Sequence, residues 1–160
     1  MLRSSTSLAL LVLVSAACSN APYTAPEVKD LRVNEVAASG DPLDWVELVT
    51  VGDQVIPLDG LYITDDVADP GKAALPVDVV VAPGEFVVVE IDEFGLGFRL
   101  GSDEAIFLIN PDGETIDSAD WDEGASPDGG SWGRAPIDGV DGSGDFVTFT
   151  TSTRGATNGT

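Results

Sequence analysis

The sequence predicts an all-β domain, built as a sandwich or barrel of short strands. Short runs rich in Val, Ile, Leu and Phe recur along most of the 160 residues. Turn-forming residues separate these runs, and the chain contains 18 Gly and 10 Pro. No long window shows the helical period of about 3.6 residues, so helix content should be very low. Short strands between regularly spaced turn signals are typical of sandwiches and barrels.

The expected strands follow from these apolar runs in chain order. They cover residues 31–38, 44–51, 55–58, 61–64, 77–82, 85–91, 98–100, 105–110, 114–121, 131–135 and 146–151. The run 85–91 is apolar along most of its length, which predicts a central strand buried on both faces. Asn110-Pro111-Asp112-Gly113 predicts a hairpin turn, because Pro fixes φ and Gly tolerates a positive φ.

The first 17 residues have the features of an export signal. Arg3 gives a short positive region, and residues 8–14 form an apolar stretch that is too short to span a bilayer. Ser15-Ala16-Ala17 then precede Cys18, the single cysteine of the chain. Ser-Ala-Ala-Cys resembles a bacterial lipobox, with Ser15 where Leu is commonest. We therefore expect cleavage before Cys18 and lipid attachment to its side chain, which anchors the product to a membrane.

This processing divides the chain into three parts. Residues 1–17 are the expected lipoprotein signal peptide, 18–30 a flexible tether that begins at the lipidated Cys18, and 31–158 the folded domain. Ser19 follows the cysteine where Asp would, by resemblance to Gram-negative lipoproteins, mean retention at the inner membrane. We therefore expect the outer membrane of a bacterial cell envelope. The sequence leaves open whether the domain faces the periplasm or the cell surface.

The charge balance argues against one class of partner. The chain has 28 Asp plus Glu against 7 Lys plus Arg, a formal net charge of −21. Nucleic acids are bound largely through Lys and Arg that neutralise phosphates, so no nucleic-acid binding is expected. An acidic surface suits solubility, a cation or a basic partner.

The absence of histidine restricts catalytic chemistry. Without His, and with Cys18 acylated, no Ser-His-Asp or Cys-His nucleophile and no His or Cys zinc site can be assembled. Glu35 and Glu47 each lie inside an apolar run and form a candidate carboxylate pair for glycosidase chemistry. The structural alternative is that both carboxylates accept hydrogen bonds or pair with Arg134 or Arg32 and lock the fold. We expect the structural role and no enzymatic activity.

Two aspartate clusters are candidate Ca²⁺ sites. The first is Asp65, Asp66 and Asp69, and the second is Asp138, Asp141 and Asp145 in a glycine-rich segment. Ca²⁺ takes six to eight oxygen ligands from flexible loops, but neither cluster has the spacing of an EF-hand. The alternative is a solvated acidic loop, so we expect no cofactor unless these loops bind Ca²⁺.

Aromatic residues offer one further candidate site. Tyr62, Trp121 and Trp132 are candidates for a sugar-binding platform, against the alternative of core packing. Trp45 lies in a core strand on the same face as Glu47, two residues away. Trp132 lies near two glycines and is expected to be the most exposed of the group.

Several motifs together resemble the lamin-tail domain family. The matching segments are LRVNEV at 31–36, DWVEL at 44–48, LDGLYITDD at 58–66, LP at 75–76, APGEFVVV at 82–89, FRLGSDE at 98–104, SWGRAP at 131–136 and TSTRGATN at 151–158. Each motif alone is weak, but the ordered set is fairly specific. The chain departs from the family pattern at Leu61-Tyr62, where Gly-Trp is usual, and at Thr153-Arg154-Gly155, where Thr-Pro-Gly is usual.

The resemblance implies an immunoglobulin-like β-sandwich. In bacteria such domains look like accessory modules on secreted or surface proteins, which implies an interaction role. We therefore expect a lipid-anchored, non-enzymatic module that contacts a protein or another component of the envelope. The alternative is an adhesive module that binds carbohydrate or depends on Ca²⁺.

Overall fold

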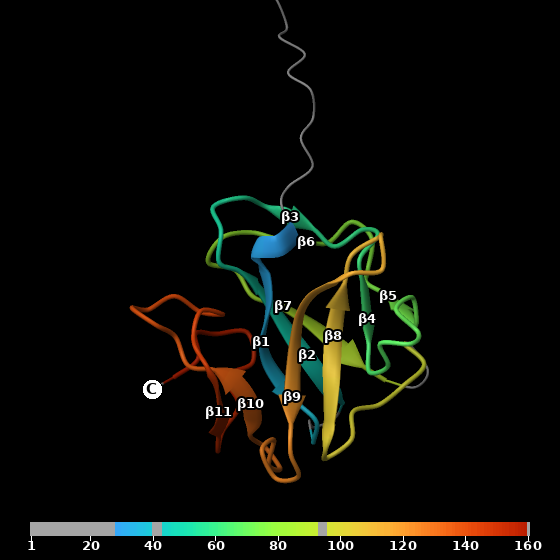
Figure 1. Cartoon of the computed structure of the whole chain (residues 1–160). Coiled ribbons are helices and arrows are strands. Elements are labelled where there is room, and N and C mark those ends of the chain that lie inside the picture. Colours follow the sequence, from blue (N-terminus) through green and yellow to red (C-terminus); the bar gives the residue numbers. More distant parts are fainter. Residues whose placement is uncertain (1–27, 40–42, 93–95, 160) are drawn as a thin grey trace, which may run out of the picture.

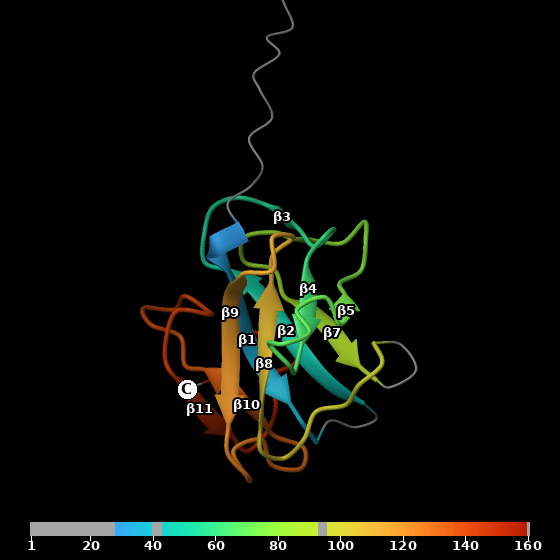
Figure 2. The ribbon, with the colours of Figure 1, turned by 45° about the vertical axis from the view of Figure 1, so that its right-hand side comes forward.

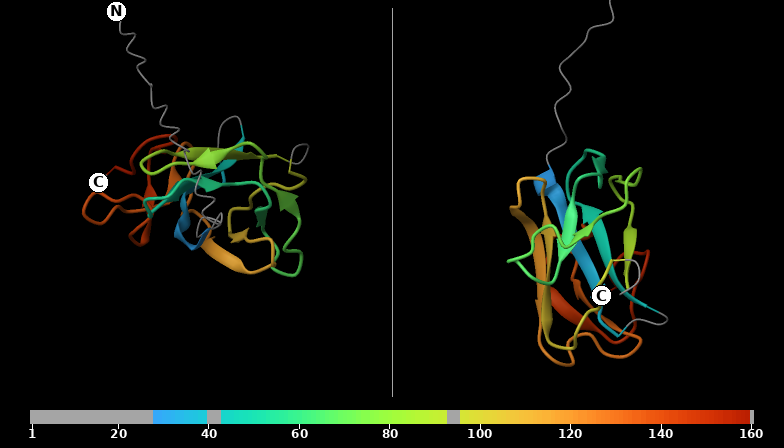
Figure 3. Two further views of the ribbon diagram at one scale, coloured as in Figure 1. Left: turned by 90° about the horizontal axis from the view of Figure 1, so that it is seen from above. Right: turned by 90° about the vertical axis from the view of Figure 1, so that its right-hand side faces the viewer.

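The computed structural model describes residues 28–39, 43–92 and 96–159 as two antiparallel β-sheets packed face to face (Figure 1). The edge-on view in Figure 3 separates the layer that contains β8 and β9 from the layer that contains β1 and β2. The expected signal peptide (1–17), Cys18 and residues 19–27 of the expected tether lie outside the described residues. The expected all-β sandwich is confirmed.

One layer is a five-stranded sheet in the order β11-β10-β1-β2-β7. Its strands are β1 (Leu31–Ala37), β2 (Asp44–Thr50), β7 (Val87–Ile91), β10 (Ser131–Arg134) and β11 (Phe146–Phe149). β10 joins the sheet beside β1, with Glu35 opposite Gly133. Figures 1 and 2 show β11 at the outer margin of this layer.

The second layer is a four-stranded sheet in the order β5-β4-β8-β9. It contains β4 (Tyr62–Thr64), β5 (Ala73–Ala74), β8 (Glu104–Ile109) and β9 (Thr115–Trp121). The expected Asn110–Gly113 turn connects β8 to β9, with Gly113 at a φ of 82°. A separate pair, β3 (Ile56–Pro57) with β6 (Val80–Val81), lies at the top of Figure 1 beside the short 3₁₀ helix Val28–Asp30.

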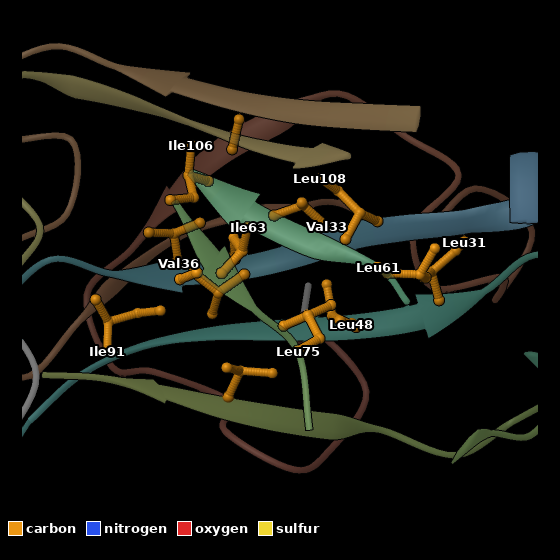
Figure 4. Close-up of a cluster of buried hydrophobic side chains, with 14 of the residues drawn as sticks. Leu31, Val33, Val36, Leu48, Leu61, Ile63, Leu75, Ile91, Ile106 and Leu108 are labelled. Atoms are coloured by element: carbon orange, nitrogen blue, oxygen red, sulfur yellow. The ribbon is translucent and has the colours of Figure 1, made fainter. Parts of the chain in front are cut away.

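The hydrophobic core fills the space between the two layers (Figure 4). Alternate residues of the strands point inward, as the pleat requires. The labelled side chains are each at most 2% exposed: Leu31, Val33, Val36, Leu48, Leu61, Ile63, Leu75, Ile91, Ile106 and Leu108. They come from both sheets, so burial of this cluster holds the layers together.

A β-bulge in β1 changes which residues face outward. Val33 is opposite Leu48 and Glu35 is opposite Glu47, so Asn34 is an extra residue in β1. A bulge of this kind places two residues of one strand opposite one residue of its partner. Val33 and Val36 both belong to the core, and Glu35 between them points to the outer face of the sheet.

The prediction that 85–91 forms a central strand is wrong. The strand is shorter, Val87–Ile91, and lies at the edge of the five-stranded sheet, where β2 is its one partner among the described strands. Val89 and Ile91 face the core, whereas Val87 and Val88 are only half-buried. A continuous apolar run therefore marks one buried face and one partly covered face here.

Other strands also differ from the expectations. The run 77–82 forms only the two-residue β6, because Asp78 takes a φ of 64°, which a strand does not accommodate, and Val77 is 63% exposed. Residues 98–100 form no strand, although Phe98 and Leu100 are buried in the core. β5 has only two residues, Ala73–Ala74, which is too short to give a strand signal in the sequence.

The described N-terminal end begins earlier than expected. Val28–Asp30, the last residues of the expected tether, form the 3₁₀ helix, and Asp30 accepts a hydrogen bond through its backbone oxygen from the Val51 amide. Among the described residues, no helix has the length and apolar character needed to cross a bilayer.

Candidate functional site

The outer face of the five-stranded sheet carries a buried pair of carboxylates. Glu35 of β1 and Glu47 of β2 are direct cross-strand partners, and neither has any solvent exposure. Like charges in directly opposed positions destabilise a sheet, and buried carboxylates need hydrogen-bond donors. The donors come from β10, from β1 and from the C-terminal segment 151–159, which we call the strap.

Glu35 accepts three hydrogen bonds. One of its oxygens, Oε1, accepts bonds from the Ser131 hydroxyl and from the Thr153 amide, the latter at 2.8 Å. The other, Oε2, lies 2.9 Å from the Thr153 hydroxyl. β10 and the strap therefore meet at this carboxylate.

Glu47 is held from two sides. Its Oε1 accepts a bond from the Asn34 side-chain amide at 2.9 Å, and its Oε2 accepts one from the Gly155 amide at 2.6 Å. Burial, helped by the negative charges of Glu35 and Asp141, raises the pKa of Glu47 to about 7, against the two hydrogen bonds that lower it. Glu47 therefore changes its protonation state near neutral pH.

Asn158 fixes the end of the strap. Its side-chain amide donates to the backbone oxygens of Arg134, at 2.8 Å, and Asn34, at 3.2 Å. Its backbone amide donates to Asp141 at 3.0 Å. Gly133 makes room for this contact, because a Cβ there would lie 3.0 Å from the Asn158 Nδ2 and 3.1 Å from the Glu35 Cγ.

One polar atom of this layer has no hydrogen-bond partner within the described residues. It is the buried side-chain oxygen of Asn34, the bulge residue. Unpaired buried acceptors are uncommon in native proteins. The Asn34 amide nitrogen donates to Glu47, but no donor faces the Asn34 oxygen. Among the described residues, this oxygen is the one buried side-chain polar atom without a hydrogen-bond partner.

Arg134 has a different role from the one expected. It pairs with neither glutamate: its Nη2 bonds to Asp117 of β9 at 3.0 and 3.2 Å. Its Nε and Nη1 donate to the backbone oxygens of Val33 and Gly144, each at 3.0 Å. Asp117 also accepts a bond from the Val33 amide at 2.9 Å. This cluster joins the edge of one sheet to the other.

Arg32 also lies away from the two carboxylates. Its guanidinium donates to the backbone oxygens of Lys29 and Leu31 at the start of β1. Of the two expected alternatives, pairing with an arginine does not occur, and both glutamates accept hydrogen bonds from neutral donors instead. The prediction that both glutamates lock the fold describes their contacts well.

This geometry leaves the carboxylate pair no access to a substrate. Each carboxyl oxygen already faces a donor from the chain, and the strap covers both groups. A glycosidase pair needs open space between the carboxyl groups for the sugar and its leaving group. The arrangement is suited to holding a segment of polypeptide.

Comparison with known families agrees with this fold. A family model for the Lamin Tail Domain matches residues 24–123, well over half of the chain. The chain belongs to the lamin tail domain family. No curated protein and no solved structure gives a significant match. The family match ends after β9, yet β10 and β11 complete the five-stranded sheet of this lamin tail domain.

The second aspartate cluster lies beside the strap. Asp138 has a φ of 53°, and Asp141 accepts the Asn158 amide. Gly142 has a φ of 77° and lies close to Val49. A Cβ added there would be 2.7 Å from Val49 Cγ2, so the position has no room for a side chain. In the part of the chain that the structure describes, no group of three or more acidic, His or Cys side chains is arranged to hold a metal ion.

The first aspartate cluster forms local contacts instead. Asp65 pairs with Lys72, and the Asp66 carboxylate accepts the Ala68 amide at 2.9 Å. Asp69 is exposed and takes part in a backbone turn with Lys72. These contacts are those of a structured acidic loop between β4 and β5.

The structure brings two of the three candidate sugar-binding aromatics together, since Trp121 and Trp132 line one small pocket. Trp121 is 2% exposed and donates through its indole nitrogen to the Gly101 backbone oxygen. Trp132 is half-buried and stacks on Phe146 with ring centroids 5.9 Å apart. Tyr62 lies apart from them on β4, which β8 separates from the β9 strand of Trp121. Trp45 is buried on the outer face, and the Arg154 guanidinium lies over its ring at 5.7 Å.

Sequence reasoning found the two carboxylates but missed their partners. The residues it did not single out are Asn34, Ser131, Thr153, Gly155, Asn158 and Asp117. Thr153, Gly155 and Asn158 do belong to the closing motif that resembles the family pattern, and that motif was the available signal. Nothing in their local sequence shows that they contact residues more than 100 positions away.

Proposed function

We propose that this chain is a lipid-anchored, non-enzymatic module of a bacterial cell envelope, and that its acidic β-sandwich contacts a protein or another envelope component. The observation that carries the proposal is that both strand carboxylates are bonded and covered within the fold. The matched family is one of non-enzymatic immunoglobulin-like domains. This family assignment supports an interaction role.

Anchoring is supported by the sequence before the domain. Cys18 follows the apolar stretch 8–14 and three small residues, and it is the only cysteine of the chain. Lipid attached to Cys18 would leave residues 19–27 between the anchor and the first described residue. A diacylglycerol together with an N-acyl chain exceeds the two hydrophobic signals that stable anchoring needs.

The charge supports a partner that is not a nucleic acid. With a net charge of −21, the chain repels phosphates over the distance of the Debye length, about 8 Å at physiological ionic strength. A basic or neutral surface on the partner is favoured. The charge therefore favours a protein or another envelope component as the partner.

The anchor is tested by fractionation and mass spectrometry of the full-length chain expressed in a Gram-negative host. We expect the protein in the membrane fraction, with an N-terminal peptide that begins at Cys18 and carries three acyl chains. Cys18→Ala should abolish both results. An unmodified wild-type product in the soluble fraction would refute anchoring and leave the fold assignment unaffected.

The membrane of residence is tested with a matched variant. Ser19→Asp should move the protein from outer-membrane to inner-membrane fractions in a density gradient, with Ser19→Thr as the control. Equal distribution of both variants would contradict the outer-membrane assignment and leave lipid attachment in place.

A further inference from the structure

The strap is held in place mainly by polar contacts. None of its residues belongs to the hydrophobic core cluster. Most strap positions are exposed, and Asn158 is the one fully buried strap residue. Segments with few buried apolar contacts open at a lower free energy than the core strands do. The strap therefore has the features of a part that opens separately from the sandwich.

The sheet supplies fixed acceptors to the strap. Glu35 receives the Thr153 amide at 2.8 Å, and Glu47 receives the Gly155 amide at 2.6 Å. These acceptors belong to β1 and β2, whose inner faces are packed in the core, so they stay in position without the strap. Alternate main-chain N–H groups held by a sheet, with side-chain pockets for specificity, are a recurring way of binding extended peptides.

A pocket for one amide side chain completes this arrangement. Asn158 reaches the backbone oxygens of Arg134 and Asn34, and it does so over Gly133, where a side chain would collide. Its oxygen lies 2.8 Å from the Thr153 hydroxyl of the same strap. The pocket therefore recognises an amide, with oxygens of the protein facing its two hydrogens.

Arg154 adds a contact at the edge of the site. Its guanidinium bonds to Glu90 at 2.6 Å and lies over the Trp45 ring. A cation is matched here by a carboxylate and an aromatic face. The strap thus presents a main-chain donor, a cation, a second main-chain donor and an amide in that order.

We infer that the outer face of the five-stranded sheet is a peptide-binding site for segments of the pattern Thr-x-Gly-x-x-Asn. In this structure the chain's own residues 151–159 fill the site, and the strap detaches as a unit while the sandwich stays folded. An opened molecule takes up the same segment from a second copy of the chain. The inference does not depend on the lipid anchor, because it concerns the folded domain only.

Detachment is tested by hydrogen exchange of the full-length chain, followed by NMR. The Thr153 and Gly155 amides should exchange about tenfold or more faster than the Val46 and Leu48 amides, and with a weaker dependence on denaturant. Equal rates with equal denaturant dependence would mean that the strap opens only when the whole domain unfolds, and would overturn the inference.

A matched pair of strap variants locates the contact. Asn158→Ala should speed exchange at Thr153 and Gly155 by at least about tenfold and leave Leu48 unchanged. Thr157→Ala is the control, because Thr157 is exposed and makes no hydrogen bond among the described residues. If Asn158→Ala unfolds the domain, Arg154→Ala serves instead, with the exchange rates of the Thr153 and Gly155 amides as the readout. Equal effects of the variant and the control would overturn the inference.

Peptide binding is tested with a synthetic peptide of residues 150–159. Added to the labelled Asn158→Ala protein at about millimolar concentration, which matches the effective concentration of a tethered segment, it should shift the Asn34 side-chain amide signals with saturation. A peptide with Asn158→Ala should not do so. The absence of a saturable shift with the wild-type peptide would overturn the binding site.

Discussion

The two faces of the five-stranded sheet are stabilised by different physical means. The inner face packs Val46 and Leu48 against the other layer, where burial of apolar area is the main contribution. The outer face carries Glu35 and Glu47, which are stabilised by donors in fixed positions. Apolar packing tolerates small shifts, whereas a buried carboxylate depends on each donor. The strength of one face is therefore spread over many contacts, and that of the other depends on a few.

The largest expected effect comes from the inner face. Leu48→Ala removes a fully buried side chain and should lower the free energy of unfolding by about 4 kcal/mol. Chemical denaturation followed by fluorescence measures this loss. Val147→Ala, at an exposed position of β11, is the control and should change stability by less than about 0.5 kcal/mol. Similar losses for both variants would contradict the assignment of the core.

Glu35→Ala should have the next largest effect. It leaves the Thr153 amide and the Ser131 hydroxyl without their acceptor, at a cost of about 3 kcal/mol, whereas the Thr153 hydroxyl keeps the Asn158 side-chain oxygen. Glu85→Ala, at an exposed carboxylate, serves as the matched control. An unchanged melting temperature for Glu35→Ala would show that the outer face does not depend on this carboxylate.

The pH dependence sharpens the comparison further. The pKa of Glu47 is raised from 4.5 to about 7 in the folded state, so the folded protein binds more protons than the unfolded chain between these values. This stabilisation is fully present below pH 4.5 and is lost as the pH rises through 7. From about pH 5 to pH 8 the loss should be about 2.5 kcal/mol, since one pKa unit corresponds to about 1.4 kcal/mol.

Glu47→Gln isolates this contribution. The difference in unfolding free energy between the wild type and Glu47→Gln should change with pH in that range. The subtraction removes the repulsion among the other carboxylates, which also grows with pH. A difference that is constant from about pH 5 to pH 8 would contradict the raised pKa of Glu47.

The smallest expected effect is at the rim of the outer face. Arg154→Ala removes the partly exposed ion pair with Glu90 and the contact with the Trp45 ring. It should cost less than about 1 kcal/mol, because exposed ion pairs contribute little and are screened by salt. Stability measured at low and high salt checks this, and the wild type and the variant should converge at high salt.

The same contrast explains what could be predicted from the sequence. The alternation of apolar residues identified β1, β2, β8 and β9 and most of the core, because the pleat imposes a period of two residues. The edge position of β7 was missed, because a continuous apolar run does not state how many strands pair with it. β6 was expected to be longer, since the positive φ of Asp78 leaves no mark in the composition.

The outer face was only half predictable. Glu35 and Glu47 were recognisable as polar residues within apolar runs. Their donors were not, because a hydrogen bond from Gly155 to Glu47 joins positions 108 residues apart and follows no local period. The pairing of Arg134 with Asp117 was likewise hidden, since charge alone does not choose among many carboxylates.

The extra residue at Asn34 determines which face of the sheet the side chains of β1 lie on. Residues before it and after it follow opposite parity, so Val33 and Val36 both reach the interior although they are separated by an odd number of positions. A regular strand that kept Asn34 in the pairing would turn Glu35 toward the interior and Val36 toward the outer face. The bulge therefore decides on which side of the sheet Glu35 and the later residues of β1 lie, and the residue that forms it also donates a hydrogen bond to Glu47.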